Sequence, residues 1–548
     1  MRLLATGRAF RGFSHALTQS LQPSRTLITS TASSRRPLLR CSYTPTTTSS
    51  SSTSFPPIRK LGIIAIGDRK YPTDEWTNVP KHITEAVTRK LHLQPDHPIC
   101  LTRKLIESAF PLPLWKYHNK LFPVVTTKQN FDSLNFPVDH PGRSRTDTYY
   151  INRNTVLRTH TSAHQADIFH ANLTDGFLIS ADVYRRDAID RSHYPVFHQM
   201  EGARMWDRKR ARPGEDLSEM IWKDFEALPD PGIIVEDPNP TFDPVRNPLQ
   251  AKHHSPAECE AIAAHLKRSI EIVVATIFRA AKEAAANNAS SSSSSSSSDP
   301  SDDNPSITDE PLKVRWIEAY FPFTSPSWEL EVFWQGDWLE LLGCGVVNQN
   351  IPSNAGVPSQ IGWAFGIGLE RIAMLLYSIP DIRLFWSQDP RFLSQFSAKK
   401  PIAPFIPFSK YPACYKDVSF WLPPATEVAE GAEAGAGAGE GDDAAATKDV
   451  DAAGSSAGGM PNPHTSSTQA PTAFHENDVM EIVRDVAQDL IEDVKLMDEF
   501  THPKTNRKSM MYRLNYRSLE RTLTNQEANE LHSKVQDKLV EILGVELR

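Results

Sequence analysis

Cysteine is scarce in this chain, and long apolar runs are missing. The five cysteines among 548 residues lie far apart with no C-x-x-C pair, so the sequence predicts neither a disulfide framework nor a zinc site. No stretch approaches about eighteen uninterrupted apolar residues, and we therefore expect no membrane-spanning helix and no membrane partner. With 39% hydrophobic and 23% charged residues, the composition is ordinary for a folded protein of two or three domains.

Acidic residues are absent from residues 1–57. This segment contains seven arginines and many serines and threonines, and residues 1–13 can form a short basic amphipathic helix. The composition is typical of a mitochondrial transit peptide, whereas a secretory signal would need a continuous apolar centre. We therefore expect residues 1–57 to direct the protein to the mitochondrial matrix; a generic disordered tail is the alternative.

Two polar segments interrupt the rest of the chain. Nine consecutive serines, Ser290–Ser298, predict a flexible insertion over about residues 284–311 within a first domain of residues 58–406. Residues 425–472 are mainly alanine, glycine, serine, proline and acids, with no aromatic residue, and are too poor in apolar side chains to fold. We expect this second insertion to interrupt a C-terminal domain of residues 407–548.

The first domain carries the pattern of an antiparallel sheet flanked by helices. Residues 177–184 form an apolar run that indicates a buried strand, and the alternation in residues 328–334 indicates a strand with one face toward a core. Ser255 suits a helix N-cap, and Glu258 completes a capping box ahead of an apolar stripe with helical spacing. Another helix is expected near Gly368. No parallel doubly wound pattern is present, so the predicted fold class is α+β.

The C-terminal domain has the element order βαββαβ. A strand is expected at residues 415–422, followed after the insertion by a helix whose apolar positions continue to Val494. A strand at residues 511–517, a helix opened by the capping box Thr524–Glu527 and a short strand at residues 545–547 complete the order. This order is that of the ferredoxin-like fold.

Two arginines stand next to rigid elements in the first domain. Arg185 directly follows the buried strand, and Arg371 ends a G-x-G-x-E-R string that begins at Gly366. Planar guanidinium groups suit phosphate and carboxylate oxygens, and Phe197 offers a ring on which a base can stack. The string lacks the third glycine and the parallel βαβ context of a dinucleotide site. Taken alone, Arg185 could equally be a structural salt-bridge residue.

Three separated strings together resemble the class II aminoacyl-tRNA synthetases. They are residues 159–165, residues 184–187 with 197–201, and residues 362–371. Arg185 and Arg371 match the arginines of motifs 2 and 3, and the resemblance implies that they are the catalytic residues. It also implies ATP as a substrate with Mg²⁺, for which Glu340 is the suggested ligand. The implied ATP-binding residues are Arg185, Ser192, His193, Tyr194, Phe197, Glu340 and Arg371.

Further strings resemble the phenylalanine-specific members of that class. Gln199 and Glu201 match an F-H-Q-x-E-G string that holds the substrate ammonium, an expected partner of a carboxylate. Phe321 and Phe323 match an F-P-F signature that places two rings edge-to-face around the substrate phenyl group; alone they would be ordinary core residues. The implied phenylalanine-binding residues are His160, Ser162, Ala163, His164, Gln165, Gln199, Glu201, Phe321, Phe323, Ala364, Phe365 and Gly366.

The C-terminal domain resembles the ferredoxin-fold anticodon-binding domain of the same family. On the strand 511–517, Tyr512, Leu514 and Tyr516 can face the core while the alternate residues face outward. The basic residues implied to bind tRNA are Lys504, Arg507, Lys508, Arg513, Arg517 and Arg521. Their basic surface would be local, because loss of the seven N-terminal arginines takes the formal net charge from −7 to −14. A solvated charged face is the alternative.

Together these resemblances, over about residues 95–422 and 473–548, are to the mitochondrial single-chain phenylalanyl-tRNA synthetases. They imply a phenylalanine–tRNA ligase that forms phenylalanyl-adenylate from L-phenylalanine and ATP, then charges tRNA(Phe). We expect a monomer, because the usual dimer-forming motif 1 is not recognisable. We expect no editing module and therefore uncorrected tyrosine activation, controlled by Ala364. The alternatives are an inactive paralogue that binds RNA and a phosphoserine-charging relative, which would need a cation in place of Phe321 and Phe323.

Overall fold

The computed structural model describes residues 62–423 and 474–548, except residues 135, 212–213, 215, 293–310, 335, 401 and 409–410. The predicted transit peptide, the second insertion and most of the serine-rich segment lie outside these residues. Among the helices that are described, none combines the length and the apolar character needed to cross a membrane.

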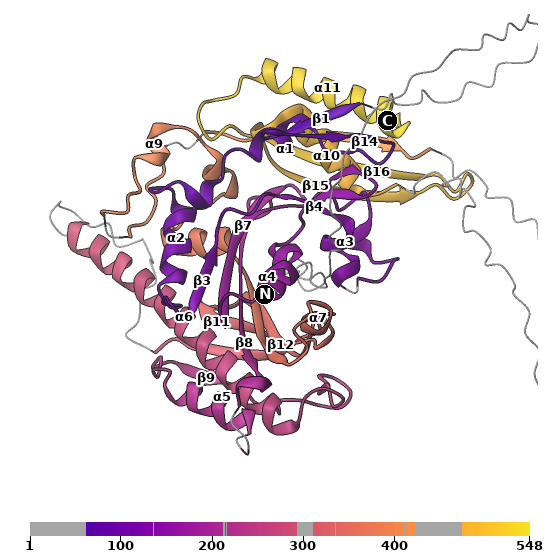
Figure 1. Cartoon of the computed structure of the whole chain (residues 1–548). Coiled ribbons are helices and arrows are strands. Elements are labelled where there is room, and N and C mark those ends of the chain that lie inside the picture. The colour runs from indigo at the N-terminus through magenta and orange to yellow at the C-terminus, as the bar shows by residue number, and fades with distance from the viewer. Residues whose placement is uncertain are drawn as a thin grey trace, which may run out of the picture.

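The first part of the chain is built on an eight-stranded sheet (Figure 1). In spatial order its strands are β3 (Trp115–His118), β7 (Gly176–Tyr184), β8 (Val196–Asp207), β13 (Gln360–Gly368), β12 (Asp337–Val347), β11 (Thr324–Trp334), β10 (Lys313–Glu318) and β9 (Ile234–Glu236). All neighbours are antiparallel except the two outermost pairs, β3 with β7 and β9 with β10, which are parallel. The predicted α+β class with an antiparallel sheet flanked by helices is confirmed.

Helices cover both faces of this sheet. On one face, α2 (Pro98–Glu107), α6 (Pro256–Ser292) and α8 (Leu369–Tyr377) share a large apolar core with the strands, and α5 (Leu217–Glu226) packs against α6. On the other face, α4 (Gln165–Ala171) and α7 (Asn350–Asn354) close a smaller core. Alternate residues of β7 supply the two cores, as the twofold period of a strand requires.

Helix α6 starts where its capping box predicts but ends later than expected. The backbone N–H of Glu258 donates to Ser255 Oγ at 3.1 Å, and the N–H of Ser255 donates back to Glu258 Oε2 at 2.9 Å. The helix continues to Ser292, so the predicted start of the flexible insertion at residue 284 is wrong. The alanines at positions 284–286 are strong helix formers and explain the extension.

Shorter elements complete the first part of the chain. A hairpin of β1 (Ile63–Ile66) and β2 (Arg69–Pro72) and a small sheet of β4 (Val124–Thr126), β6 (Thr155–Leu157) and β5 (Tyr150–Asn152) form two further sheets. The short helices are α1 (Lys81–Ala86), α3 (Thr127–Asn130) and α9 (Pro390–Leu393), with 3₁₀ turns at Leu91–Leu93, Asp132–Leu134, Pro141–Arg143, Thr161–His164, Arg208–Arg210 and Ile382–Trp386; a further 3₁₀ turn, Gln488–Leu490, lies in the C-terminal part.

The C-terminal part forms a second sheet with its own core. Its elements are β14 (Cys414–Trp421), α10 (Glu476–Ala487), β15 (Ile491–Thr501), β16 (Lys508–Tyr516), α11 (Asn525–Leu543) and β17 (Glu546–Leu547). The spatial order β15-β16-β14-β17 is antiparallel throughout, and α10 and α11 pack on one face. The predicted ferredoxin-like arrangement is confirmed, as is the capping box at Thr524.

One helix boundary was predicted wrongly. The helix expected to continue to Val494 ends at Ala487, and Val494 lies in strand β15. Gln488 adopts a positive φ of 49°, which a helix cannot continue through. The apolar spacing of Val486, Leu490 and Val494 suits a helix, but hydrogen bonding to β16 makes residues 491–501 a strand.

Candidate active site

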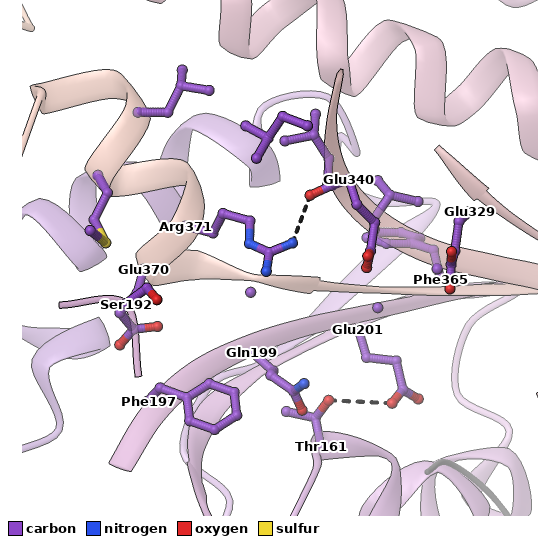
Figure 2. A pocket seen from close by; sticks show the side chains of 18 of the residues that line it. Thr161, Ser192, Phe197, Gln199, Glu201, Glu329, Glu340, Phe365, Glu370 and Arg371 are labelled. Atoms are coloured by element: carbon purple, nitrogen blue, oxygen red, sulfur yellow. Dashed lines mark hydrogen bonds between the residues drawn. The ribbon is translucent and has the colours of Figure 1, made fainter. Parts of the chain in front are cut away.

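One cavity of about 520 Å³ collects most of the residues that the sequence singled out. It lies between β8, β12, β13 and α8, and the segment between β7 and β8 closes one side (Figure 2). The residues predicted to bind ATP or phenylalanine that line it are Ser162, Gln165, Arg185, Ser192, His193, Tyr194, Phe197, Gln199, Glu201, Phe321, Phe323, Glu340, Ala364, Phe365, Gly366 and Arg371.

Three predicted substrate contacts do not line the cavity. His160 is fully buried, its ring is stacked on that of Phe136, and burial lowers its pKa well below the usual range. Ala163 packs in a small apolar cluster, and His164 lies against the guanidinium of Arg158. The tight 3₁₀ turn Thr161–His164 turns these side chains away while it presents its neighbours to the cavity. The three residues support the wall from behind.

A buried carboxylate forms the acidic end of the cavity. Glu201 is 2% exposed, and its oxygens accept hydrogen bonds from the hydroxyl of Thr161 (Figure 2), from the hydroxyl of Ser162 and, at 2.8 Å, from the amide of Gln165. Burial raises the pKa of Glu201 to about 8, because these neutral donors offset the lost hydration only in part. A cation placed against this carboxylate would lower that pKa.

Two amide oxygens stand beside Glu201 with hydrogen-bonding capacity in reserve. Gln165 Oε1 and Gln199 Oε1 are buried in the cavity wall, and neither has a hydrogen-bond partner within the part of the chain that the structure describes. Buried acceptors are costly to leave unsatisfied. Together with the carboxylate they form a group of acceptors suited to a ligand with several N–H donors, such as an ammonium group.

The other end of the cavity is basic. Arg185 follows β7 directly; its Nε donates to the carbonyl of Thr159 at 2.8 Å, and its guanidinium lies 5.3 Å from the centre of the Phe197 ring. Arg371, in the first turn of α8, donates to the carbonyl of Glu340 at 2.7 Å (Figure 2). Burial lowers the pKa of both guanidinium groups, which an anion bound between them would oppose.

The carboxylates of Glu340 on β12 and Glu329 on β11 face the cavity from adjacent strands. Burial, reinforced by the neighbouring Glu329, raises the pKa of Glu340, and Arg371 opposes the shift. Oxygen ligands of this kind are those that Mg²⁺ prefers, usually together with substrate phosphates and water. No group of three or more metal-ligating side chains occurs among the described residues, so these carboxylates fit a metal only as part of its coordination shell.

An aromatic wall closes the remaining side. The rings of Phe321 and Phe323 have centroids 5.3 Å apart and are inclined at 31° to each other. Gly343 on β12 is required behind them, because a Cβ there would lie 2.6 Å from the Phe321 ring. Ala364 and Phe365 of β13 complete the wall.

The sequence did not indicate several residues of this cavity. Asp187, Glu329 and Gly343 line it, and Glu370 supports it by accepting hydrogen bonds from the ring (2.7 Å) and backbone (2.8 Å) of buried His198. Both Glu370 and His198 lie inside strings that were singled out, so their complementary charge and hydrogen bonding offered a signal. No sequence signal pointed to Glu329 or Gly343, because only strand register brings them to the cavity.

The predicted tRNA-binding residues are spread over the C-terminal part, and most are in ion pairs. The pairs are Arg507 with Glu546, Lys508 with Glu499, Arg513 with Asp417, Arg517 with Glu492 and Arg521 with Glu527. Lys504 is exposed in the turn between β15 and β16. The prediction that Asn515 faces solvent is wrong: it is 2% exposed, because the first part of the chain covers that end of the sheet.

Comparison with known families assigns both parts of the chain. Residues 84–212 and 306–396 match the family described as tRNA synthetases class II core domain (F), and residues 467–548 match the ferredoxin-fold anticodon binding domain. A solved pyrrolysyl-tRNA synthetase from Desulfitobacterium hafniense aligns with a TM-score of 0.29 at 9% identity over 55% of this chain and 77% of that chain, too low to support an argument. The matched domains and the sheet define the class, a class II aminoacyl-tRNA synthetase.

Curated relatives give the particular family. The mitochondrial phenylalanine–tRNA ligase of Saccharomyces cerevisiae is 44% identical over 89% of this chain and 96% of its own length. That of Mus musculus is 38% identical over 89% of each chain, and the chloroplastic/mitochondrial enzyme of Arabidopsis thaliana is 36% identical over 93% and 94%. This chain belongs to the mitochondrial phenylalanine–tRNA ligase family.

Proposed function

We propose that this protein is the phenylalanine–tRNA ligase of mitochondria. It activates L-phenylalanine with ATP to phenylalanyl-adenylate and transfers the phenylalanyl group to the 3′-terminal ribose of tRNA(Phe). The observation that carries the proposal is the chemistry of the cavity. One end offers Glu201 and two amide oxygens, the other end offers two half-buried guanidinium groups, and an aromatic wall lies at its side.

The acidic end would hold the amino acid. The α-ammonium group would donate to the Glu201 carboxylate and to Gln165 and Gln199, which supply the acceptors that the buried site has in reserve. The phenyl group would lie against Phe321 and Phe323, with Ala364 at the far end of the ring. This arrangement directs the substrate carboxylate toward the basic end.

The basic end would hold ATP. Adenine would stack on Phe197, while Arg185 and Arg371 would hold the phosphates and stabilise the charge that spreads over their oxygens as the carboxylate attacks the α-phosphorus. Mg²⁺, held in part by Glu340 and Glu329, would neutralise phosphate charge when bound. The protein's own contribution is to fix the two anions next to each other in a buried site.

The C-terminal domain would bind the tRNA, with Lys504, Arg507, Lys508, Arg513, Arg517 and Arg521 as candidate contacts. The ion pairs of five of these residues mean that phosphate would have to compete with carboxylates, which makes the binding sensitive to salt. We also propose that the protein acts as a monomer, because the dimer-forming motif 1 is not recognisable in the sequence.

Pyrophosphate–ATP exchange tests the proposal on protein that lacks its first 57 residues. The assay is run without tRNA across all twenty amino acids. We expect exchange with phenylalanine, weaker exchange with tyrosine, and loss of both in Arg185→Ala. Folded protein that binds tRNA(Phe) but shows no exchange would favour the inactive paralogue instead.

A further inference from the structure

The segment between β7 and β8, residues 185–195, has two sides, and we call it the ATP loop. One side faces the cavity through five side chains: Arg185, Asp187, Ser192, His193 and Tyr194. The other side faces the C-terminal domain, whose sheet lies across this end of β7 in Figure 1. The loop contains no helix or strand of its own, so packing against its neighbours must fix its conformation.

The C-terminal domain includes part of the ATP loop in its own core. Ile189 is 6% exposed and packs with Val494 and other apolar residues of α10, β15 and β16, not with the core of the first domain. The backbone N–H of Val494 donates to the Ile189 carbonyl at 3.0 Å. The middle of the loop is therefore structurally a piece of the C-terminal domain.

Polar side chains of α10 hold the loop's backbone. The buried guanidinium of Arg484 donates to the carbonyls of Asp187 at 2.8 Å and Ala188 at 3.1 Å, and it also pairs with Glu481. Asn477 donates to the carbonyl of Arg186 at 3.3 Å. Three successive loop carbonyls thus accept hydrogen bonds from one helix of the C-terminal domain, which fixes the backbone on both sides of Asp187.

The far end of the loop is held by charge. Arg191 donates through Nε and Nη2 to Glu492 at 2.8 and 2.5 Å, although the Arg191 side chain is itself 57% exposed. The hydroxyl of Tyr194, whose side chain also lines the cavity, donates to Asp489 at 2.9 Å. Loop contacts with the C-terminal domain therefore reach from Arg186 to Tyr194, almost the full length of the loop.

We propose that the C-terminal domain positions the ATP loop, so that adenylate formation depends on its docking even when no tRNA is present. The domain that would bind tRNA is then also a part of the ATP site. Arg484, Arg191 and Glu492 are positioning residues: none lines the cavity, and each acts on ATP through the loop backbone. The inference rests on the proposed function, because it concerns the ATP step of that reaction.

The experiment measures pyrophosphate exchange with phenylalanine, without tRNA, for the parent protein and four variants. Arg191→Gln removes the ion pair to Glu492, and Arg191→Lys retains its charge. Arg484→Lys keeps a cation for Glu481 but loses the planar guanidinium group that donates to the loop carbonyls. The control is Lys538→Gln, which removes the 3.9 Å pair between Lys538 of α11 and Asp485 of α10 without contacting the loop. Thermal unfolding is recorded for every variant.

We expect the effect to appear in the KM for ATP and not in the KM for phenylalanine. Arg484→Lys should raise the KM for ATP at least about 20-fold, because hydrogen bonds from a charged donor to the loop are lost. Arg191→Gln should raise it about 5-fold, and Arg191→Lys should return it to within about 2-fold of the parent. Loss of folded protein would lower kcat and leave both KM values unchanged, so it is distinguishable from displacement of the loop.

The outcomes separate this inference from the proposed function. If the parent shows no exchange with phenylalanine, the proposed function fails and this inference falls with it. If the parent is active and folded Arg484→Lys and Arg191→Gln keep the parent's KM for ATP, only the positioning role is overturned. An equal rise in Lys538→Gln would also overturn it, because the effect would then come from general loosening of the C-terminal domain.

Discussion

Two buried glutamates, one in each part of the molecule, are held in opposite ways. Glu201 in the cavity is 2% exposed and accepts hydrogen bonds from two hydroxyls and an amide, all of them neutral. Glu492, on strand β15 of the C-terminal sheet, is 1% exposed and lies within 3.5 Å of the guanidinium nitrogens of Arg191, Arg383 and Arg517. The first carboxylate is solvated by dipoles and the second by charges.

This difference separates the group that we propose to bind the substrate ammonium from a structural one. A buried carboxylate surrounded by arginines already has its counter-charge, and removing it would strand those cations. A buried carboxylate with neutral donors keeps part of its desolvation cost, which a cationic ligand can relieve on binding. Glu201 therefore lowers the stability of the protein while the cavity is empty, and a bound cation would recover that stability as affinity. Four predictions follow the comparison from its largest to its smallest effect.

Glu201→Gln should abolish most phenylalanine activation. The amide keeps the size of the side chain and one acceptor oxygen but removes the charge that attracts the substrate ammonium, so kcat/KM for phenylalanine should fall about 100- to 1,000-fold. The KM for ATP should change little, because Glu201 lies at the other end of the cavity. Steady-state pyrophosphate exchange measures both values; a fall below about tenfold would remove Glu201 from the amino-acid site.

Glu492→Gln should act on stability instead. Loss of the carboxylate removes the counter-charge that three arginines share, although Arg383 keeps its pair with Asp381, and we expect the free energy of unfolding to fall by about 3 kcal/mol. Urea denaturation gives the difference, and the KM for phenylalanine serves as the control that should stay unchanged. A loss under about 1 kcal/mol would mean that the cluster contributes little.

The two sites should also differ in their dependence on pH. The pKa of Glu201 is about 8 in the folded protein, whereas the ordinary value of a glutamate, 4.5, applies to the unfolded chain. The folded state therefore holds this proton more tightly. Ionisation then costs stability progressively as pH rises from about 4.5 to about 8. Glu201→Gln removes that cost; its advantage over the parent in unfolding free energy should grow by about 2 kcal/mol between pH 5 and pH 6.5 and continue to grow until about pH 8.

Phenylalanine distinguishes this pH effect from a general one. A saturating concentration supplies the missing cation, so it should stabilise the parent at pH 8.5 and leave Glu201→Gln unaffected. Thermal unfolding at several pH values with and without the amino acid gives both comparisons. An identical pH dependence in parent and variant would show that Glu201 ionises normally in the empty cavity.

The smallest expected effect is on the aromatic side of the cavity. Ala364→Gly removes one methyl group from the wall and makes room for a phenolic hydroxyl, so activation of tyrosine relative to phenylalanine should rise about tenfold. The ratio of the two kcat/KM values measures this change. No increase would mean that Ala364 does not lie at the far end of the substrate ring.

Sequence patterns predicted the fold where local signals were strong. The run at residues 177–184 became the fully buried strand β7, and both capping boxes formed at the ends of their helices. The prediction failed at Gln488, which ends α10 with a positive φ, a conformation that a glycine would have indicated. It also failed at Asn515, because strand alternation shows which face a residue takes but not what covers that face.

Motifs predicted the cavity better than spacing could have done. Glu201 and Phe197 lie on β8, Arg371 comes from α8 and Phe321 from the connection before β11, so no local pattern unites them. The motif around His160 predicted more cavity-lining residues than the structure has, because only some residues of a tight turn can face the same way. The two-sided role of the ATP loop was invisible, since Ile189 and Val494 are brought together only by the docked domains.

The position of Ile189 also has a consequence for the order in which the protein is completed. This residue leaves the ribosome long before β15, and at about 5–20 residues per second the chain between Ile189 and Val494 takes roughly 15 to 60 s to make. The sheet that receives it needs β14 and β16, which are separated by residues 422–507. The ATP loop is thus synthesised well before the sheet that completes its packing.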